Sequence, residues 1–166
     1  MRSKTSTQMQ SRVLGIDPGF DRIGIAILEG ETLLYSECIK TDRKLLHPKR
    51  LVQIGTRLKK ILDKWEPHVL AIENLFFNQN TTNALKVSEA RGVILYEAAS
   101  AGLQVFEYSP QAVKIAVTSY GKADKGQIAS MVRKLVALPS KKMLDDELDA
   151  IALCITHIVS HHNIKG

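Results

Sequence analysis

The sequence predicts an α/β domain with a mixed five-stranded sheet flanked by helices. Three strand-like apolar segments follow one another near the N-terminus, before any helical pattern begins. Helical and strand-like segments then alternate, and the last third of the chain shows helical patterns separated by loops. Consecutive strands favour an antiparallel meander and the later alternation favours parallel neighbours, so the combined sheet is mixed.

The first half of the chain supplies the meander and one helix. Strands are predicted at residues 13–16, 24–28 and 33–41, joined by the short connections "PGFDR" and "EGE". Apolar residues then recur at helical spacing from Leu51 to Trp65, with Pro48 near the start and Pro67 just beyond the end. This pattern predicts an amphipathic helix.

The second half adds two strands and the remaining helices. The segment "HVLAIE", residues 68–73, is a short apolar run that ends in an acid, and "LQVFEY", residues 103–108, is predicted as the fifth strand. Between them a helix is expected to begin near Thr81 or Thr82, and residues 110–162 are expected to be helical with loops.

Length and composition indicate one globular domain. We expect a single domain over residues 13–162 and a short disordered extension over residues 1–12, which is Ser/Thr-rich and acid-free and also faintly like an organelle transit peptide. No apolar run approaches the roughly 20 residues that span a bilayer. Cys38 and Cys154 are expected to be reduced, buried thiols. The net charge of +6 modestly favours nucleic acid.

Acidic residues stand where strands end and where the last helix begins. Asp17 ends the first strand, Glu73 ends the fourth, and Asp145, Asp146 and Asp149 lie in the first turns of a C-terminal helix. Each acid alone is equally well explained as a solvated residue or as a favourable charge at a helix N-terminus. Asp149, however, lies beside the apolar face of its helix, where a solvated acid is not expected.

Carboxylates from such distant segments repel one another unless a cation lies between them. Oxygen ligands without His or Cys suit a hard ion such as Mg²⁺ or Mn²⁺. Two such ions about 4 Å apart fit in-line phosphodiester hydrolysis, in which one activates water and the other stabilises the leaving oxygen.

Six motifs in order resemble the RuvC family of Holliday-junction resolvases, over about residues 13–157. They are "LGIDPG", "AIENLFF", "NALKVSEARGV", "VFEYSPQAVK", "GKADKGQIASMV" and "DELDAIALCITH". The resemblance implies a ribonuclease H-like fold and an endonuclease that cuts four-way DNA junctions by paired symmetric nicks in recombination and repair. Each nick leaves a 5′-phosphate and a 3′-hydroxyl.

The resemblance also implies the catalytic residues. Asp17, Glu73, Asp146 and Asp149 match the four acids that hold two Mg²⁺ ions, or Mn²⁺, in each subunit. On a helical wheel Asp145 lies nearer to Asp149 than Asp146 does, but the register with "DAIALCITH" favours Asp146.

The DNA contacts that the resemblance implies are aromatic and basic. Phe76 matches an aromatic that inserts beside the exchange point of the junction, where unstacked bases give it a surface. Lys114 and Lys125 match basic positions of DNA contact, and Lys125 also matches a catalytic one. Lys86 and Arg91 match basic residues on the second helix, where ordinary solvated charge is an equal alternative.

Partners follow from the symmetry of the substrate. A four-way junction is close to two-fold symmetric, so a homodimer with one site per subunit suits it. The small-residue row Ala84, Ser88 and Gly92 is expected either to form part of that dimer contact or to pack on its own sheet. The resemblance further implies a branch-migration motor complex as partner and a bacterial cytoplasmic, nucleoid-associated location, without a membrane.

Three other functions fit parts of the pattern. A phosphotransferase of the actin and sugar-kinase type shares the opening "GIDPG", although it needs a second domain. A non-catalytic junction-binding protein keeps the fold without the activity. A ribonuclease H-like nuclease acting on RNA–DNA hybrids shares the acids and the metals.

Overall fold

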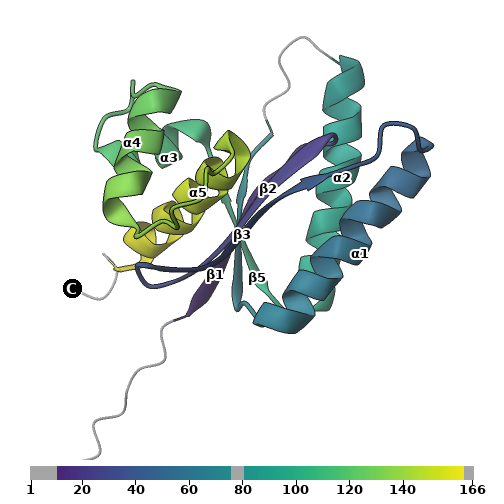
Figure 1. The fold of residues 1–166 in the computed structure, drawn as a ribbon, viewed down its shortest axis with the longest axis horizontal. Helices are drawn as coiled ribbons and strands as arrows, with labels where there is room; N and C mark the ends of the chain where they lie inside the picture. The colour runs from purple at the N-terminus through teal and green to yellow at the C-terminus, as the bar shows by residue number, and fades with distance from the viewer. Residues whose placement is uncertain (1–10, 76–80, 163–166) are drawn as a thin grey trace, which may run out of the picture.

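The computed structural model describes residues 11–75 and 81–162, apart from the side chains of residues 81, 82 and 162. Its strands are β1 (Arg12–Asp17), β2 (Arg22–Glu29), β3 (Thr32–Lys40), β4 (Val69–Glu73) and β5 (Gln104–Tyr108). Its helices are α1 (His47–Trp65), α2 (Thr81–Ser100), α3 (Pro110–Thr118), α4 (Lys125–Leu135) and α5 (Asp145–His162). Figure 1 shows α1 and α2 on one side of the sheet and α3, α4 and α5 on the other.

The strands form one mixed sheet in the order β3-β2-β1-β4-β5. The pairs β1–β2 and β2–β3 are antiparallel, whereas β1–β4 and β4–β5 are parallel. The predicted mixed five-stranded α/β fold is therefore confirmed. The strands are slightly longer than expected, since β1 begins one residue earlier and β2 extends by two residues at its start.

The two faces of the sheet support two separate apolar cores. Successive residues of a strand point to opposite faces. Leu14 and Ile16 of β1 pack in the core beneath α1 and α2, whereas Val13 packs in the core with α5. Asp17 continues the alternation of Val13, so it belongs to the face that α5 covers.

The helix boundaries follow local chemistry. α1 has a proline in its first turn and ends at Trp65; the next residue, Glu66, adopts a left-handed backbone conformation (φ 46°) directly before Pro67. Asp124 caps α4 by accepting a hydrogen bond from the Gln127 N–H at 2.8 Å, and the Gln127 side chain accepts one in return from the Asp124 N–H.

The expectation that both cysteines are buried needs correction. Both cysteines are free, but only Cys154 is buried, while Cys38 is half-buried on β3. Within the described ranges, none of the helices has the length and apolar character needed to cross a membrane.

Candidate active site

Asp17 and Glu73 lie side by side at one edge of the sheet. They end β1 and β4, which are neighbouring parallel strands with Ile16 opposite Ile72 in the register. Val69 and Ala71 of β4 pack in the α5 core, so by alternation Glu73 projects toward α5, as Asp17 does. Two acids 56 positions apart in the chain are thus brought to the same face and the same edge.

Glycines on β1 and β2 let α5 approach the sheet closely. A Cβ atom at Gly15 would lie 2.1 Å from the carbonyl oxygen of Ala150, and one at Gly24 would lie 1.8 Å from that of Asp146. The buried Cys154 thiol completes this contact, because its Sγ donates to the Val13 carbonyl oxygen at 3.4 Å. The backbone of α5 therefore rests directly on the first two strands.

The first turn of α5 is fixed by a glutamate that the resemblance does not single out. Glu147 is 4% exposed and accepts hydrogen bonds from the Ser36 hydroxyl at 2.8 Å and the Leu144 N–H at 3.0 Å. Lys141 lies 3.4 Å from the same carboxylate. These contacts hold the helix start against β3 and place Asp146 and Asp149 beside the strand-end acids.

Burial and like charge both act on the acids of this cluster. Burial, followed by repulsion from Asp149, Glu73 and Asp146, raises the pKa of Asp17 from 3.8 to about 7. Burial and repulsion from Asp149 also raise the pKa of Glu73, and burial raises that of Asp149. Asp146 contributes to the raised pKa of Asp17 and Asp145 does not, although the exposed Asp145 contributes, after Asp146, to the raised pKa of Asp149.

Basic side chains partly compensate this negative charge. The Lys125 Nζ lies 3.0 Å from the Asp149 Oδ2, and Arg22 at the start of β2 forms an ion pair with Asp146. The hydrogen bond with Asp149 is the largest cause of a raised pKa for Lys125, so this ammonium stays protonated.

The donor set fits a hard divalent ion in chemistry and in charge. All four candidate ligands are carboxylates, and burial, followed by repulsion from the neighbouring acids, raises the pKa of Asp17, so a bound cation would relieve an unfavourable charge. As placed, no group of three or more His, Cys, Asp or Glu side chains in residues 11–75 and 81–162 is arranged to hold a metal ion. Asp146 and Asp149 are instead paired with Arg22 and Lys125, each through its Oδ2.

The turn that follows Asp17 is held from α1. Arg50 is 8% exposed, and its guanidinium lies 3.8 Å from the centre of the Phe20 ring. It donates to the Thr41 hydroxyl at 2.9 Å and forms an ion pair with Asp21. This contact lowers the pKa of Asp21. The network fixes the β1–β2 turn and therefore the end of the strand that carries Asp17.

The other predicted DNA contacts have different surroundings. Lys86 Nζ lies 5.8 Å from the centre of the Phe20 ring in the β1–β2 turn, and Lys114 is half-buried on α3. Arg91 is only 15% exposed, and its Nη2 lies 3.0 Å from the Glu107 Oε1, so it links α2 to β5 rather than standing as a solvated charge. Phe76 lies outside the described residues.

Arg22, Arg50 and Glu147 are the residues that sequence reasoning missed. Arg22 was recognisable only as a basic residue at the start of a strand. Its partner, Asp146, lies 124 positions away in the sequence. Arg50 could not be distinguished from an ordinary helix arginine in the sequence, because only folding brings Asp21 and Thr41 next to it.

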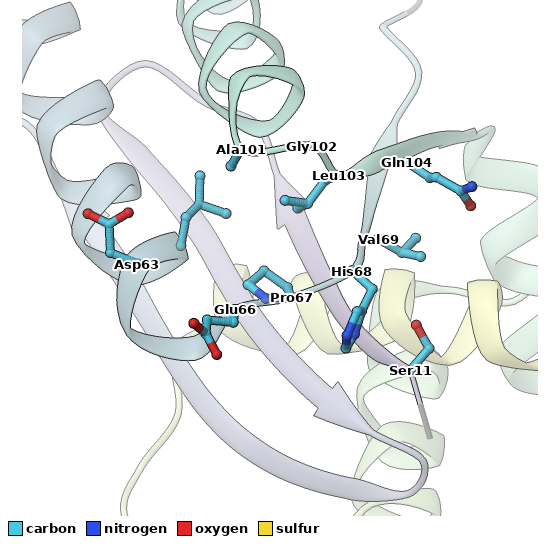
Figure 2. Close-up of a pocket in the computed structure, with 11 residues that line it drawn as sticks. Ser11, Asp63, Glu66, Pro67, His68, Val69, Ala101, Gly102, Leu103 and Gln104 are labelled. Carbon is cyan, nitrogen blue, oxygen red and sulfur yellow. The ribbon is translucent and has the colours of Figure 1, made fainter. Parts of the chain in front are cut away.

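A cavity of about 830 Å³ lies at the opposite end of the sheet (Figure 2). It is bounded by the residues that begin β1, β4 and β5 and by the C-terminal ends of α1 and α2, among them Ser11, Glu66, His68, Gly102 and Gln104. Since β1 and β4 are parallel and carry their acids at their other ends, this cavity is separate from the carboxylate cluster.

The chain is similar to known proteins over nearly its whole length. The family model described as crossover junction endodeoxyribonuclease RuvC matches residues 13–157. The protein of that name from Desulfitobacterium hafniense (strain DSM 10664 / DCB-2) is 43% identical over 149 residues, covering 87% of this chain and 90% of the relative. The one from Rubrobacter xylanophilus is 42% identical over 159 residues, covering 93% and 89%.

The fold of the chain is also similar to that of a solved structure. The RuvC protein of T. thermophilus, in complex with a Holliday junction substrate, superposes with a TM-score of 0.87 at 31% identity, covering 93% of this chain and 96% of that one. The family match over residues 13–157 spans the positions of all four acids of the cluster. The chain belongs to the RuvC family of crossover junction endodeoxyribonucleases.

Proposed function

We propose that this chain resolves four-way DNA junctions by paired, symmetric, metal-dependent nicks during recombination and repair. The observation that carries the proposal is the convergence of Asp17, Glu73, Asp146 and Asp149 from β1, β4 and α5 at one edge of the sheet. Family membership supports the reaction, and the T. thermophilus relative solved with a Holliday junction supports the substrate.

The four carboxylates would hold two Mg²⁺ ions, with Mn²⁺ as an alternative. Bound there, such ions supply an activated water and neutralise charge on the reacting phosphate. The protein fixes Asp17 and Glu73 on rigid strands, and Glu147 fixes the turn that carries Asp146. Lys125, kept protonated by its acidic neighbours, places a positive charge where the phosphate gains negative charge.

Junction binding would depend on phosphate contacts and on one aromatic wedge. Lys125 contacts Asp149, Lys86 lies near Phe20 in the turn after β1, and Lys114 lies on α3, whose N-terminus follows β5 beside Glu73. Arg91 would contribute by holding α2 against β5 more than by free charge. Phe76 follows β4 by three positions and is proposed to stack on an unpaired base at the exchange point.

A homodimer would present two such sites to opposing strands. On α2 the residues Leu85, Gly92 and Tyr96 follow one exposed stripe at spacings of seven and four, with Leu85 63% and Tyr96 70% exposed. A Cβ atom at Gly92 would meet nothing within 4 Å, so Gly92 does not pack on its own sheet. Ala84 and Ser88 are half-buried, which moves the proposed dimer contact from the small-residue row to this stripe.

The remaining partners are proposed from the family alone. A branch-migration motor complex would deliver the junction, and the enzyme would act at the nucleoid in the cytoplasm of a bacterium, where that substrate forms.

The proposal is tested with a labelled mobile four-way junction and a linear duplex of matching sequence, each with and without Mg²⁺. We expect paired nicks in the junction only, with ends that a ligase reseals, and loss of cleavage in Asp17→Asn with unchanged junction binding. Binding without cleavage under either metal would instead identify a non-catalytic junction-binding protein. Preferential cleavage of an RNA–DNA hybrid would identify a ribonuclease H-like enzyme of different specificity.

A further inference from the structure

Arg22 makes direct contact with one of the candidate metal ligands. It begins β2 on the face that α5 covers, and its guanidinium forms an ion pair with the Asp146 Oδ2. The Arg22 side chain is 46% exposed and that of Asp146 is 23% exposed, so the pair lies at the rim of the carboxylate cluster. The Cys38 thiol lies 3.7 Å from the same oxygen.

This cation and a divalent ion compete for the same carboxylate. A guanidinium stays charged at every pH that the protein tolerates, so it cannot leave Asp146 by losing a proton. A hard ion bound to Asp146 would repel the guanidinium at close range. Loading the metal therefore requires Arg22 to move, and an exposed side chain has the freedom to do so.

The Arg22–Asp146 pair is not needed to hold α5 in place. Gly24 already permits the backbone of α5 to rest on β2, and the buried Glu147 anchors the same helical turn through Ser36 and Leu144. Partly exposed ion pairs contribute little to folding stability. A role in ligand exchange explains the position of Arg22 better than a role in stability.

We propose that Arg22 is an internal counter-ion that leaves Asp146 when a phosphate of the junction takes over its guanidinium, so that metal binding and junction binding reinforce each other. Arginine is well suited to this exchange, since its planar donors fit carboxylate and phosphate equally. Because such coupling is reciprocal, Arg22 would keep the metal affinity of the free enzyme low and allow the site to load on DNA. The inference rests on the proposed metal site.

The first test measures Mn²⁺ binding to the DNA-free protein by the paramagnetic resonance signal of unbound Mn²⁺. We expect Arg22→Gln to bind Mn²⁺ about tenfold more tightly than the wild type, because a competing charge is removed. Arg22→Lys, which keeps the charge, should bind Mn²⁺ nearly as the wild type does. Lys40→Gln is the matched control, since exposed Lys40 lies opposite Arg22 on β3 and should change the affinity less than twofold.

Equal Mn²⁺ affinities for Arg22→Gln and Lys40→Gln would overturn the counter-ion role. The phosphate step is tested by junction binding in EDTA over a range of salt concentrations, where Arg22→Gln should lower the salt-dependence slope by about one. An unchanged slope would overturn that step.

The two proposals fail in distinguishable ways. A wild-type protein that cuts junctions while all variants bind Mn²⁺ alike would contradict only the role of Arg22. Absence of Mn²⁺ binding even in Arg22→Gln would contradict the metal site as well. Circular dichroism melting verifies that each variant is folded.

Discussion

Replacing Gly24 with alanine tests whether the close contact between α5 and β2 sets the geometry of the active site. An added Cβ would lie 1.8 Å from the carbonyl oxygen of Asp146, whereas ordinary van der Waals contact begins at 3.4 Å. The two backbones must therefore separate by about 1.6 Å at this point. Because this oxygen belongs to Asp146 itself, the displacement acts directly on a candidate metal ligand.

Misplacing a catalytic group by about 1 Å can cost on the order of 100-fold in rate. We therefore expect Gly24→Ala to lower kcat for junction cleavage by about 100-fold or more, with a loss of about 1–3 kcal/mol in unfolding free energy from overpacking. Single-turnover cleavage of a labelled junction measures the rate, and urea unfolding measures the stability.

Gly55→Ala on α1 is the control, because its added Cβ would meet a Val93 side-chain methyl at 3.1 Å, far from the acids. A side-chain methyl gives way more easily than a backbone carbonyl, so this variant should retain its cleavage rate. If folded Gly24→Ala cleaves within threefold of the wild type, the contact does not control the position of Asp146, and the reasoning is wrong.

Asp17→Asn should raise the melting temperature in EDTA at pH 8. The pKa of Asp17 is raised to about 7 in the native state, so its ionised form destabilises the native state above pH 7. After solvent screening we expect a gain of about 1–2 kcal/mol in unfolding free energy, which Mg²⁺ should remove. Burial, and then the neighbouring His161, lower the pKa of His157 to about 4, so the unfolded chain takes up a proton between about pH 6.5 and 4 that the native state does not. Stability should therefore fall on acidification through this range, and His157→Gln should reduce the loss between pH 7 and 4.5 by about 2 kcal/mol in urea unfolding; an unchanged pH dependence would exclude His157 as its cause. Leu85→Lys places a charge on the exposed stripe of α2 and should shift the protein toward monomer in sedimentation equilibrium, whereas Val105→Lys on β5 should not; equal effects of both would contradict a dimer contact on α2.

Much of the fold was predictable because local pattern and packing agree. The short continuous apolar runs of β1, β2 and β4 and the helical stripe of α1 each indicate their own element. The strand-end positions of Asp17 and Glu73 were also visible in the sequence, although each acid alone is equally well explained as a solvated residue. Their adjacency then followed from the parallel pairing of β1 with β4.

The contacts that complete the site were not visible, because they join distant segments through geometry that no local pattern encodes. The need for glycine at position 24 depends on where α5 crosses β2, and the partner of Arg22 depends on the same crossing. Arg91 was expected as a DNA contact or a solvated charge, and its ion pair with Glu107 depends on how α2 docks beside β5. The exposed stripe on α2 could not be predicted, because it depends on which side of that helix packs against the sheet.

The most direct test of the central claim compares Asp146→Asn with Asp145→Asn in cleavage of a four-way junction with Mg²⁺. The two acids are neighbours in the first turn of α5. Only Asp146 is paired with Arg22 and contributes to the raised pKa of Asp17, whereas Asp145 is exposed. We predict that Asp146→Asn abolishes paired nicking while binding the junction, and that Asp145→Asn cleaves at close to the wild-type rate. Cleavage by Asp146→Asn, or its loss in Asp145→Asn alone, would contradict the active site described above.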